Sequence, residues 1–261
     1  MMAEQSVLTG ELTWPEFEAR MAGGDTPVII PLGSHEQHGL HMPLSTDVVL
    51  PTEFARRVAR RIGALVAPTF VYGYKSQQKS GGGQHIPGTL SLDGATYVAQ
   101  VKEVIKELAR NGARRFVMVN GHYENSWFMV EGIDLALREL RWDHIRDVKV
   151  VAASYWDFIT PTTIAELYPN GFPGIELEHG GVMETSLMLA LRPDLVHMDR
   201  VVDHPPAKFP PYDVYPVKGE WTPRTGCLSS PKEASREKGE TLLRVCTDGL
   251  VGALETELKA G

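Results

Sequence analysis

The stretch that decides the fold reads VIIPLGSHEQHGLHMPLSTD, from Val28 to Asp47. It opens with a short β-branched apolar run after Thr26-Pro27, a pattern typical of a buried strand. One carboxylate, three imidazoles and a second carboxylate then follow within 13 residues. In an extended loop, residues two apart point the same way, so Glu36 and His38 can face one point to which Asp47 returns. Because imidazoles and carboxylates suit zinc, manganese and similar ions, the stretch predicts a metal site, with a solvated polar loop as the alternative.

A second strand-like run ends in the same way. The apolar run at 115–119 leads into NGHYEN at 120–125, which again places a His and a Glu two residues apart. In open α/β sheets, sites form outside the carboxyl ends of the strands, so we expect the two motifs to meet at one edge. Such a set suits a binuclear centre, in which a carboxylate bridges two ions that clamp a water and a substrate oxygen. The candidate ligands are Glu36, His38, Asp47, His122 and Glu124.

Helical and strand-like patterns alternate along the rest of the chain. The periodicity predicts helices at 12–21, 47–62, 93–111, 125–141, 182–191 and 232–258, and strands at 65–67, 70–72 and 148–153. The proline-rich residues 201–231 are predicted to be irregular. This alternation favours one α/β domain over residues 1–261, with a mostly parallel central sheet.

A glycine-rich loop spans residues 73–92 and contains the run Gly81-Gly82-Gly83. It lacks the Gly-Lys-Ser/Thr ending of a P-loop, so a phosphate cradle is disfavoured. Three glycines allow close approach of the backbone to a ligand, and long loops in compact domains are often functional. We therefore interpret this segment as a substrate loop, with disorder as the alternative.

Composition narrows the range of partners. The net charge of −7 argues against nucleic acid or an anionic membrane as a partner. The sequence contains no apolar run of transmembrane length and no N-terminal signal-like segment. Cys227 and Cys246 fit no paired metal-binding pattern. Two buried free thiols in a reduced, cytoplasmic protein are the simplest interpretation.

Three motifs are similar to those of the creatininase family of metal-dependent amidohydrolases. They are Gly-Ser-x-Glu-Gln-His-Gly followed by Thr-Asp, then Asn-Gly-His-x-Glu-Asn, then Glu-His-Gly-Gly, and the likeness covers nearly the whole chain. The resemblance implies a three-layer α/β/α fold, a homohexamer and a binuclear zinc or manganese site. The activity that it implies is the reversible hydrolysis of the cyclic amide creatinine to creatine.

The resemblance also implies roles for individual residues. One ion would take His38, Asp47 and Glu124, and the other Glu36, Asp47 and His122, with Asp47 as the bridge. The implied substrate-contacting or catalytic residues are Ser80, Tyr123, Glu176 and His179, and Trp156 matches an aromatic residue in the wall of the site.

His179 is the candidate for proton transfer. Because a leaving ring nitrogen needs a proton, a histidine that titrates near neutral pH suits this task. We expect the adjacent Glu178 to orient the imidazole, as carboxylates beside functional histidines often do. The alternative is a histidine that merely caps the following helix.

The flap over the substrate departs from the family pattern. Ile175 stands where the family enzyme has tryptophan, and Glu176 where it has aspartate. Isoleucine excludes water but cannot stack on a flat polar ring, so we expect weaker binding of creatinine. An amide hydrolase or deaminase that acts on another small nitrogenous ring is the alternative. A non-catalytic metal-binding scaffold is a third reading, disfavoured because a scaffold needs no acid–base group beside its metals.

Overall fold

The structure is a computed structural model that describes residues 6–259. Its centre is a parallel sheet of four strands in the order β2-β1-β3-β4. The strands are β1 (Val28–Leu32), β2 (Leu65–Val66), β3 (Arg115–Asn120) and β4 (Lys149–Ser154). Leu32 is in register with Asn120, which is in register with Ser154. The carboxyl ends of three strands are therefore level at one edge of the sheet.

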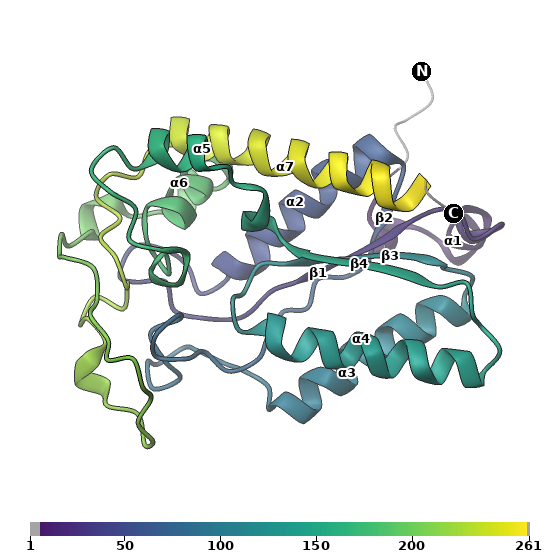
Figure 1. Ribbon diagram of the computed structural model, residues 1–261. Coiled ribbons are helices and arrows are strands. Elements are labelled where there is room, and N and C mark those ends of the chain that lie inside the picture. Colours follow the sequence, from purple (N-terminus) through teal and green to yellow (C-terminus); the bar gives the residue numbers. More distant parts are fainter. Residues whose placement is uncertain (1–5, 260–261) are drawn as a thin grey trace.

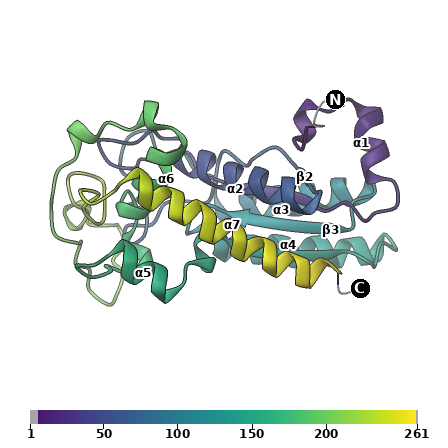
Figure 2. The ribbon, with the colours of Figure 1, turned by 90° about the horizontal axis from the view of Figure 1, so that it is seen from above.

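Helices cover both faces of the sheet (Figure 1). On one face lie α3 (Gly94–Arg110) and α4 (Asn125–Trp142), and on the other lie α2 (Thr46–Ile62), α6 (Val182–Leu191) and α7 (Arg236–Lys259). Seen from above, α7 runs along the length of the molecule over the sheet (Figure 2). The expected three-layer α/β/α architecture is confirmed.

The side chains on the two faces of the central strands pack into two separate hydrophobic cores. In β1, Ile29 packs into the core beneath α2, α6 and α7, whereas Val28 and Ile30 pack against α3 and α4. Every residue of β1 is buried. A strand buried on both faces has no polar alternation, which explains why its sequence reads as one continuous apolar run.

Most predicted helices lie where the sequence places them. Helix α1 (Trp14–Met21) begins after Thr13, whose backbone N–H and side chain both donate to Glu16. Helix α2 ends at Gly63, which has a left-handed φ of 71°. The remaining elements of the described residues are α5 (Pro161–Leu167) and six short 3₁₀ helices: η1 (Thr9–Glu11), η2 (Tyr155–Phe158), η3 (Ile175–Leu177), η4 (Pro193–Leu195), η5 (Met198–Arg200) and η6 (Gly219–Trp221).

Two predicted elements differ from the structure. The strand expected at 70–72 is reduced to a single bridge between Phe70 and Leu32. The last helix begins at Arg236 rather than at residue 232, because Pro231 starts a turn that Ala234 N–H closes with a 2.9 Å hydrogen bond. Gly239 does not interrupt this helix: a Cβ there would meet Ser186 O at 2.0 Å, so the glycine lets α7 approach α6 closely.

Two irregular segments gather at the carboxyl edge of the sheet. The loop 73–92 forms only isolated bridges, between Leu90 and His35 and between Leu92 and Tyr74. Residues 201–231, drawn in light green in Figure 1, contain only η6 and extend beyond the helical layers. No helix within residues 6–259 is long and apolar enough to cross a membrane.

Candidate active site

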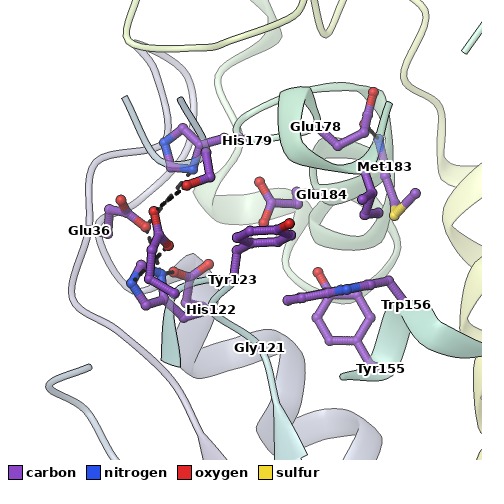
Figure 3. A pocket seen from close by; sticks show the side chains of 14 residues that line it. Glu36, Gly121, His122, Tyr123, Tyr155, Trp156, Glu178, His179, Met183 and Glu184 are labelled. Carbon is purple, nitrogen blue, oxygen red and sulfur yellow. Dashed lines mark hydrogen bonds and ion pairs between the residues drawn. The ribbon is translucent and has the colours of Figure 1, made fainter. Parts of the chain in front are cut away.

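A pocket lies where β1, β3 and β4 end, and the segments that follow these strands line it (Figure 3). The cavity measures ≈ 40 Å³. Its lining residues are Glu36, Asp47, Ser80, Gly121, His122, Tyr123, Glu124, Tyr155, Trp156, Ile175, Glu178, His179, Met183 and Glu184. The parallel register thus brings the two sequence motifs to one place, as expected for an open α/β sheet.

One donor group consists of Glu36, Asp47 and His122, all of them buried. The Nδ1 atom of His122 lies 3.0 Å from Glu36 Oε2 and 3.0 Å from Asp47 Oδ2. The opposite ring nitrogen, Nε2, lies 2.9 Å from the backbone carbonyl of Tyr74. A carbonyl only accepts, so Nε2–H donates to it, and Nδ1 faces the two carboxylates, where it can hold either a proton or a metal ion.

A second donor group consists of His38, Asp47 and Glu184. His38 Nε2 lies 2.9 Å from Asp47 Oδ1 and 3.5 Å from Glu184 Oε2. Its Nδ1 lies 3.1 Å from the backbone carbonyl of Glu36, which fixes the ring hydrogen on that side. Asp47 therefore turns one oxygen toward each histidine, the arrangement that a bridging carboxylate needs.

Glu184 was not among the residues predicted from the sequence. It lies in the first turn of α6, and its Oε2 accepts a 2.7 Å hydrogen bond from Gly180 N–H. The one available signal was its composition, because Glu184 is the single charged residue of an otherwise apolar and hydroxyl-bearing helix.

Glu124 is placed differently from the expected ligand. Its Oε1 accepts hydrogen bonds from Gln77 N–H at 2.7 Å and from the Ser80 hydroxyl at 2.6 Å. Its Oε2 lies 3.3 Å from His122 Nε2. The described residues form a third donor group, Glu36, His38 and His179. Glu124 lies beside the first donor group but belongs to none of the three.

The donor groups fit divalent cations. Two buried carboxylate oxygens of the cluster, Glu36 Oε1 and Glu124 Oε2, have no hydrogen-bond partner among residues 6–259. Burying unpartnered carboxylates is costly unless a cation compensates them. Imidazole nitrogens and carboxylate oxygens are the ligands that zinc and manganese accept. The donor atoms available here therefore match the expected metals.

The pKa values of the side chains in this cluster are shifted by burial and by the neighbouring charges. Burial, opposed by His122, raises the pKa of Glu36 to about 7. Burial alone would raise the pKa of Asp47, but the imidazoles of His38 and His122 hold it well below its usual range. Although burial disfavours charged imidazoles, the surrounding carboxylates hold the pKa values of both histidines well above their usual range. The cluster attracts positive charge, whether protons or metal ions.

His179 lies at the side of this cluster. Its ring is centred 4.4 Å from the His38 ring, and its Nδ1 lies 3.9 Å from Glu36 Oε2. Burial and the neighbouring His38 hold the pKa of His179 well below its usual range. Its Nε2 lies 2.9 Å from the side-chain nitrogen of Gln37. Helix α6 has Gly181 at its N-cap, so the alternative of a helix-capping histidine is disfavoured.

Glu178 does not make the contact that the sequence suggested. Its Oε2 accepts a 2.8 Å hydrogen bond from Met183 N–H in the first turn of α6, and its Oε1 accepts from the Ser229 hydroxyl at 3.4 Å. Burial raises its pKa to about 7. Among the described residues, Gln37 rather than Glu178 meets the His179 ring. The free N–H groups of a helix start attract a carboxylate, which explains the difference.

The wall opposite the donor groups is aromatic. Tyr123 and Trp156 lie nearly parallel, with ring centroids 6.5 Å apart and planes at 18°, and Figure 3 shows Tyr123 between the donor groups and Trp156. Ile175 lines the same pocket. Glu176 lies further out, where its Oε1 is 3.5 Å from the Tyr123 hydroxyl. It lines a larger groove of ≈ 810 Å³ that continues outward past Ser80 and Tyr123.

Comparisons with known proteins identify the family of this chain. The family model described as creatinine amidohydrolase matches residues 10–254. A creatinine amidohydrolase from Pseudomonas putida is 64% identical over 254 residues, covering 97% of this chain and 98% of that protein.

Solved structures give the same result. A manganese form of creatininase matches with a TM-score of 0.96 and 64% identity, covering 97% of this chain and 99% of that one. A zinc–zinc form of a Glu-to-Gln variant matches with a TM-score of 0.96 and 63% identity, covering 98% and 99%. The same variant complexed with creatine matches with a TM-score of 0.95 and 63% identity, covering 97% and 99%.

Proposed function

The chain belongs to the creatininase family, and we propose that it hydrolyses the cyclic amide bond of creatinine to give creatine, reversibly. The observation that carries this proposal is the pair of donor groups that share Asp47 beneath an aromatic wall. A small pocket with convergent polar groups and one aromatic side fits a small, flat, polar ring. The creatine bound to a relative of 63% identity supports the same substrate.

We propose that two divalent ions, zinc or manganese, occupy the donor groups. Glu36, Asp47 and His122 would hold one ion, as the family resemblance implies. For the other ion, the structure assembles Glu184 with His38 and Asp47, and we propose Glu184 in the place first expected for Glu124. When bound, such ions lower the pKa of a water and polarise a substrate carbonyl.

The chain's own residues would then move the protons. Glu124, whose Oε1 is held by Ser80, would take a proton from the attacking water at its free Oε2. Glu124 would then pass this proton to the leaving ring nitrogen. Because the pKa of His179 is held well below its usual range, its ring is neutral and would act as a hydrogen-bond donor to the substrate, rather than as the proton donor first expected. Glu124 gives up the proton that it gained and thus returns to its starting state, and the His179 ring keeps its hydrogen throughout. Glu178 would act indirectly, by holding the first turn of α6 and with it Glu184.

The direct test is a ring-opening assay with creatinine. We expect creatine to form when the protein carries zinc or manganese and to stop forming after chelation. Readdition of either ion should restore the activity. A protein with two bound ions per chain and no creatinine turnover would overturn the proposal.

The isoleucine in the wall favours one second candidate. Ile175 cannot stack on a ring as an aromatic residue does, so a related cyclic amide, urea or amidine that depends less on stacking than creatinine would lose less here. A panel of such compounds, assayed with the same metal-loaded protein, separates the candidates. A compound with a kcat/KM above that of creatinine would identify the preferred substrate.

We further propose that the chain forms a single domain, assembles as a homohexamer and works in the cytoplasm. Large exposed apolar side chains, including Trp14, Trp142 and Tyr215, support assembly because they would be covered by partner copies. Two buried free thiols suit a reducing compartment. Light scattering should give a mass near six times 28.9 kDa.

A further inference from the structure

We propose that Gln37 is the positioning residue that fixes the ring orientation and the tautomer of His179. Gln37 lies between the two candidate ligands Glu36 and His38, and it is buried. The proposal rests on the proposed function only for its catalytic consequence. The assignment of the tautomer rests on hydrogen-bond geometry alone.

The orientation of the Gln37 amide is determined by backbone groups that can act in only one way. Its Nε2 lies 2.9 Å from Gly226 O and 3.2 Å from Gly81 O, and carbonyl oxygens only accept. Its Oε1 lies 3.0 Å from Gly39 N–H, which only donates. The flipped amide would set an oxygen against two carbonyls and an NH₂ group against an N–H, losing three hydrogen bonds in a buried site.

This orientation decides where the His179 hydrogen lies. The same amide nitrogen is 2.9 Å from His179 Nε2. Because that nitrogen only donates, Nε2 of the imidazole must be the acceptor, and the neutral ring carries its hydrogen on Nδ1. The amide nitrogen has two hydrogens for three acceptors, Gly226 O, Gly81 O and His179 Nε2, so one hydrogen is shared as in a three-centre bond.

The backbone around Gln37 leaves space for its side-chain amide. A Cβ at Gly226, where φ is 82°, would meet Gln37 Oε1 at 2.2 Å. A Cβ at Gly82 would meet Gln37 Nε2 at 2.9 Å. Two glycines from distant segments therefore make room for one side chain, which gives the glycine-rich loop a structural role beside the pocket.

The consequence for the reaction follows from the position of Nδ1. This nitrogen lies 3.9 Å from Glu36 Oε2, on the side of the donor groups. Because Gln37 occupies Nε2, the ring presents its N–H donor toward the reacting centre and needs no tautomer exchange before each turnover. Gln37 does not touch the reacting atoms in this arrangement, so it acts through His179.

Two variants of Gln37 test the proposal, and their effects are compared with each other. Gln37→Glu places an acceptor opposite Nε2 and should shift the ring hydrogen from Nδ1 to Nε2. Gln37→Met keeps the length of the side chain but removes the donor, so both tautomers should be populated. We expect kcat to fall about ten- to hundredfold in Gln37→Glu and less in Gln37→Met, with KM nearly unchanged.

The decisive readout is the ¹⁵N spectrum of histidine-labelled, metal-loaded protein, with the His179 signals assigned from their loss in His179→Asn. A protonated Nδ1 and an unprotonated Nε2 in the wild type support the proposal, and a protonated Nε2 overturns it. An unchanged kcat in both Gln37 variants also overturns it. So does a loss of bound metal that accounts for the whole loss of activity, because Gln37 would then serve the ligands.

Failure of the proposed function would look different. If the wild type does not turn over creatinine, the tautomer spectrum still tests the hydrogen-bond assignment. If Gln37→Glu fails to fold, the wild-type spectrum and Gln37→Met decide the question without it.

Discussion

The two sides of the pocket are built in different ways. On the ligand side, Glu36, His38, Asp47 and His122 are at most 3% exposed, and further hydrogen bonds hold both histidine rings. On the flap side, Ile175 and Glu176 lie in a 3₁₀ turn with no buried residue, which follows Gly174 at a φ of 109°. The ligand side is fixed by strand register and burial, whereas the flap side is a single short turn without a buried residue. Reaction chemistry should therefore depend on the first side and substrate choice on the second.

The strongest test of this contrast is Asp47→Ala. Asp47 belongs to both of the donor groups proposed to bind ions, so the substitution removes one ligand from each ion. We expect at most one weakly bound ion and a fall in turnover of about a thousandfold or more. Elemental analysis and the creatinine assay measure the two effects. Asp25→Ala, at an exposed position, is the matched control, and two tightly bound ions with full activity in Asp47→Ala would contradict the assignment.

The next largest effect is expected for His179→Asn. The variant should keep its ions, because both candidate ion sites retain their proposed ligands, but turnover should fall about a hundredfold. His144→Asn is a suitable control, because His144 is exposed and has a φ of 62° that asparagine tolerates. Near-normal turnover in His179→Asn would return this histidine to a purely structural role.

Glu184→Gln probes a part of the ligand side that the sequence did not predict. We expect the affinity for one ion to fall about ten- to hundredfold, whether Glu184 binds the ion or orients His38. Glu124→Gln is the matched comparison and should retain both ions while turnover falls. If Glu124→Gln loses an ion and Glu184→Gln does not, the ligand set implied by the family resemblance is correct instead.

The smallest effect is expected on the flap side. Ile175→Trp adds an aromatic surface that can stack on a flat ring, worth about 1 kcal/mol or roughly fivefold in kcat/KM for creatinine. Metal content should not change, because Ile175 contributes no donor atom. Weaker activity toward creatinine in this variant would indicate that the flap is adapted to a different ring.

The ligand side was largely predictable from the sequence, for a physical reason. Continuous apolar runs mark β1 and β3 as strands buried on both faces, and ligand pairs follow each run directly. Parallel pairing then forces the two loops to the same edge. The start of α7 was harder to predict, because residues 232–235 suit a helix by composition and the turn at Pro231 prevails.

Contacts between distant segments were not predictable in the same way. Glu184 approaches His38 across the pocket from α6, and no sequence spacing connects them. Glu178 was preferred as the partner of His179 because the two are neighbours in the chain, yet its carboxylate turns to Met183 N–H. The alternation that points Glu36 and His38 to one side points Gln37 to the other, so the sequence spacing gives no sign of its contact with His179.

The position of Asp47 has a consequence for the stability of the protein during storage. Asp47 lies in the first turn of α2, so an ion held there also fastens the start of a 17-residue helix. Such a helix start frays easily when its anchor is removed. Preparations stored in chelating buffer would therefore open first at this turn and expose the buried Leu50 and Phe54 to neighbouring molecules. Shelf life would then be limited by the retention of metal rather than by the strength of the core.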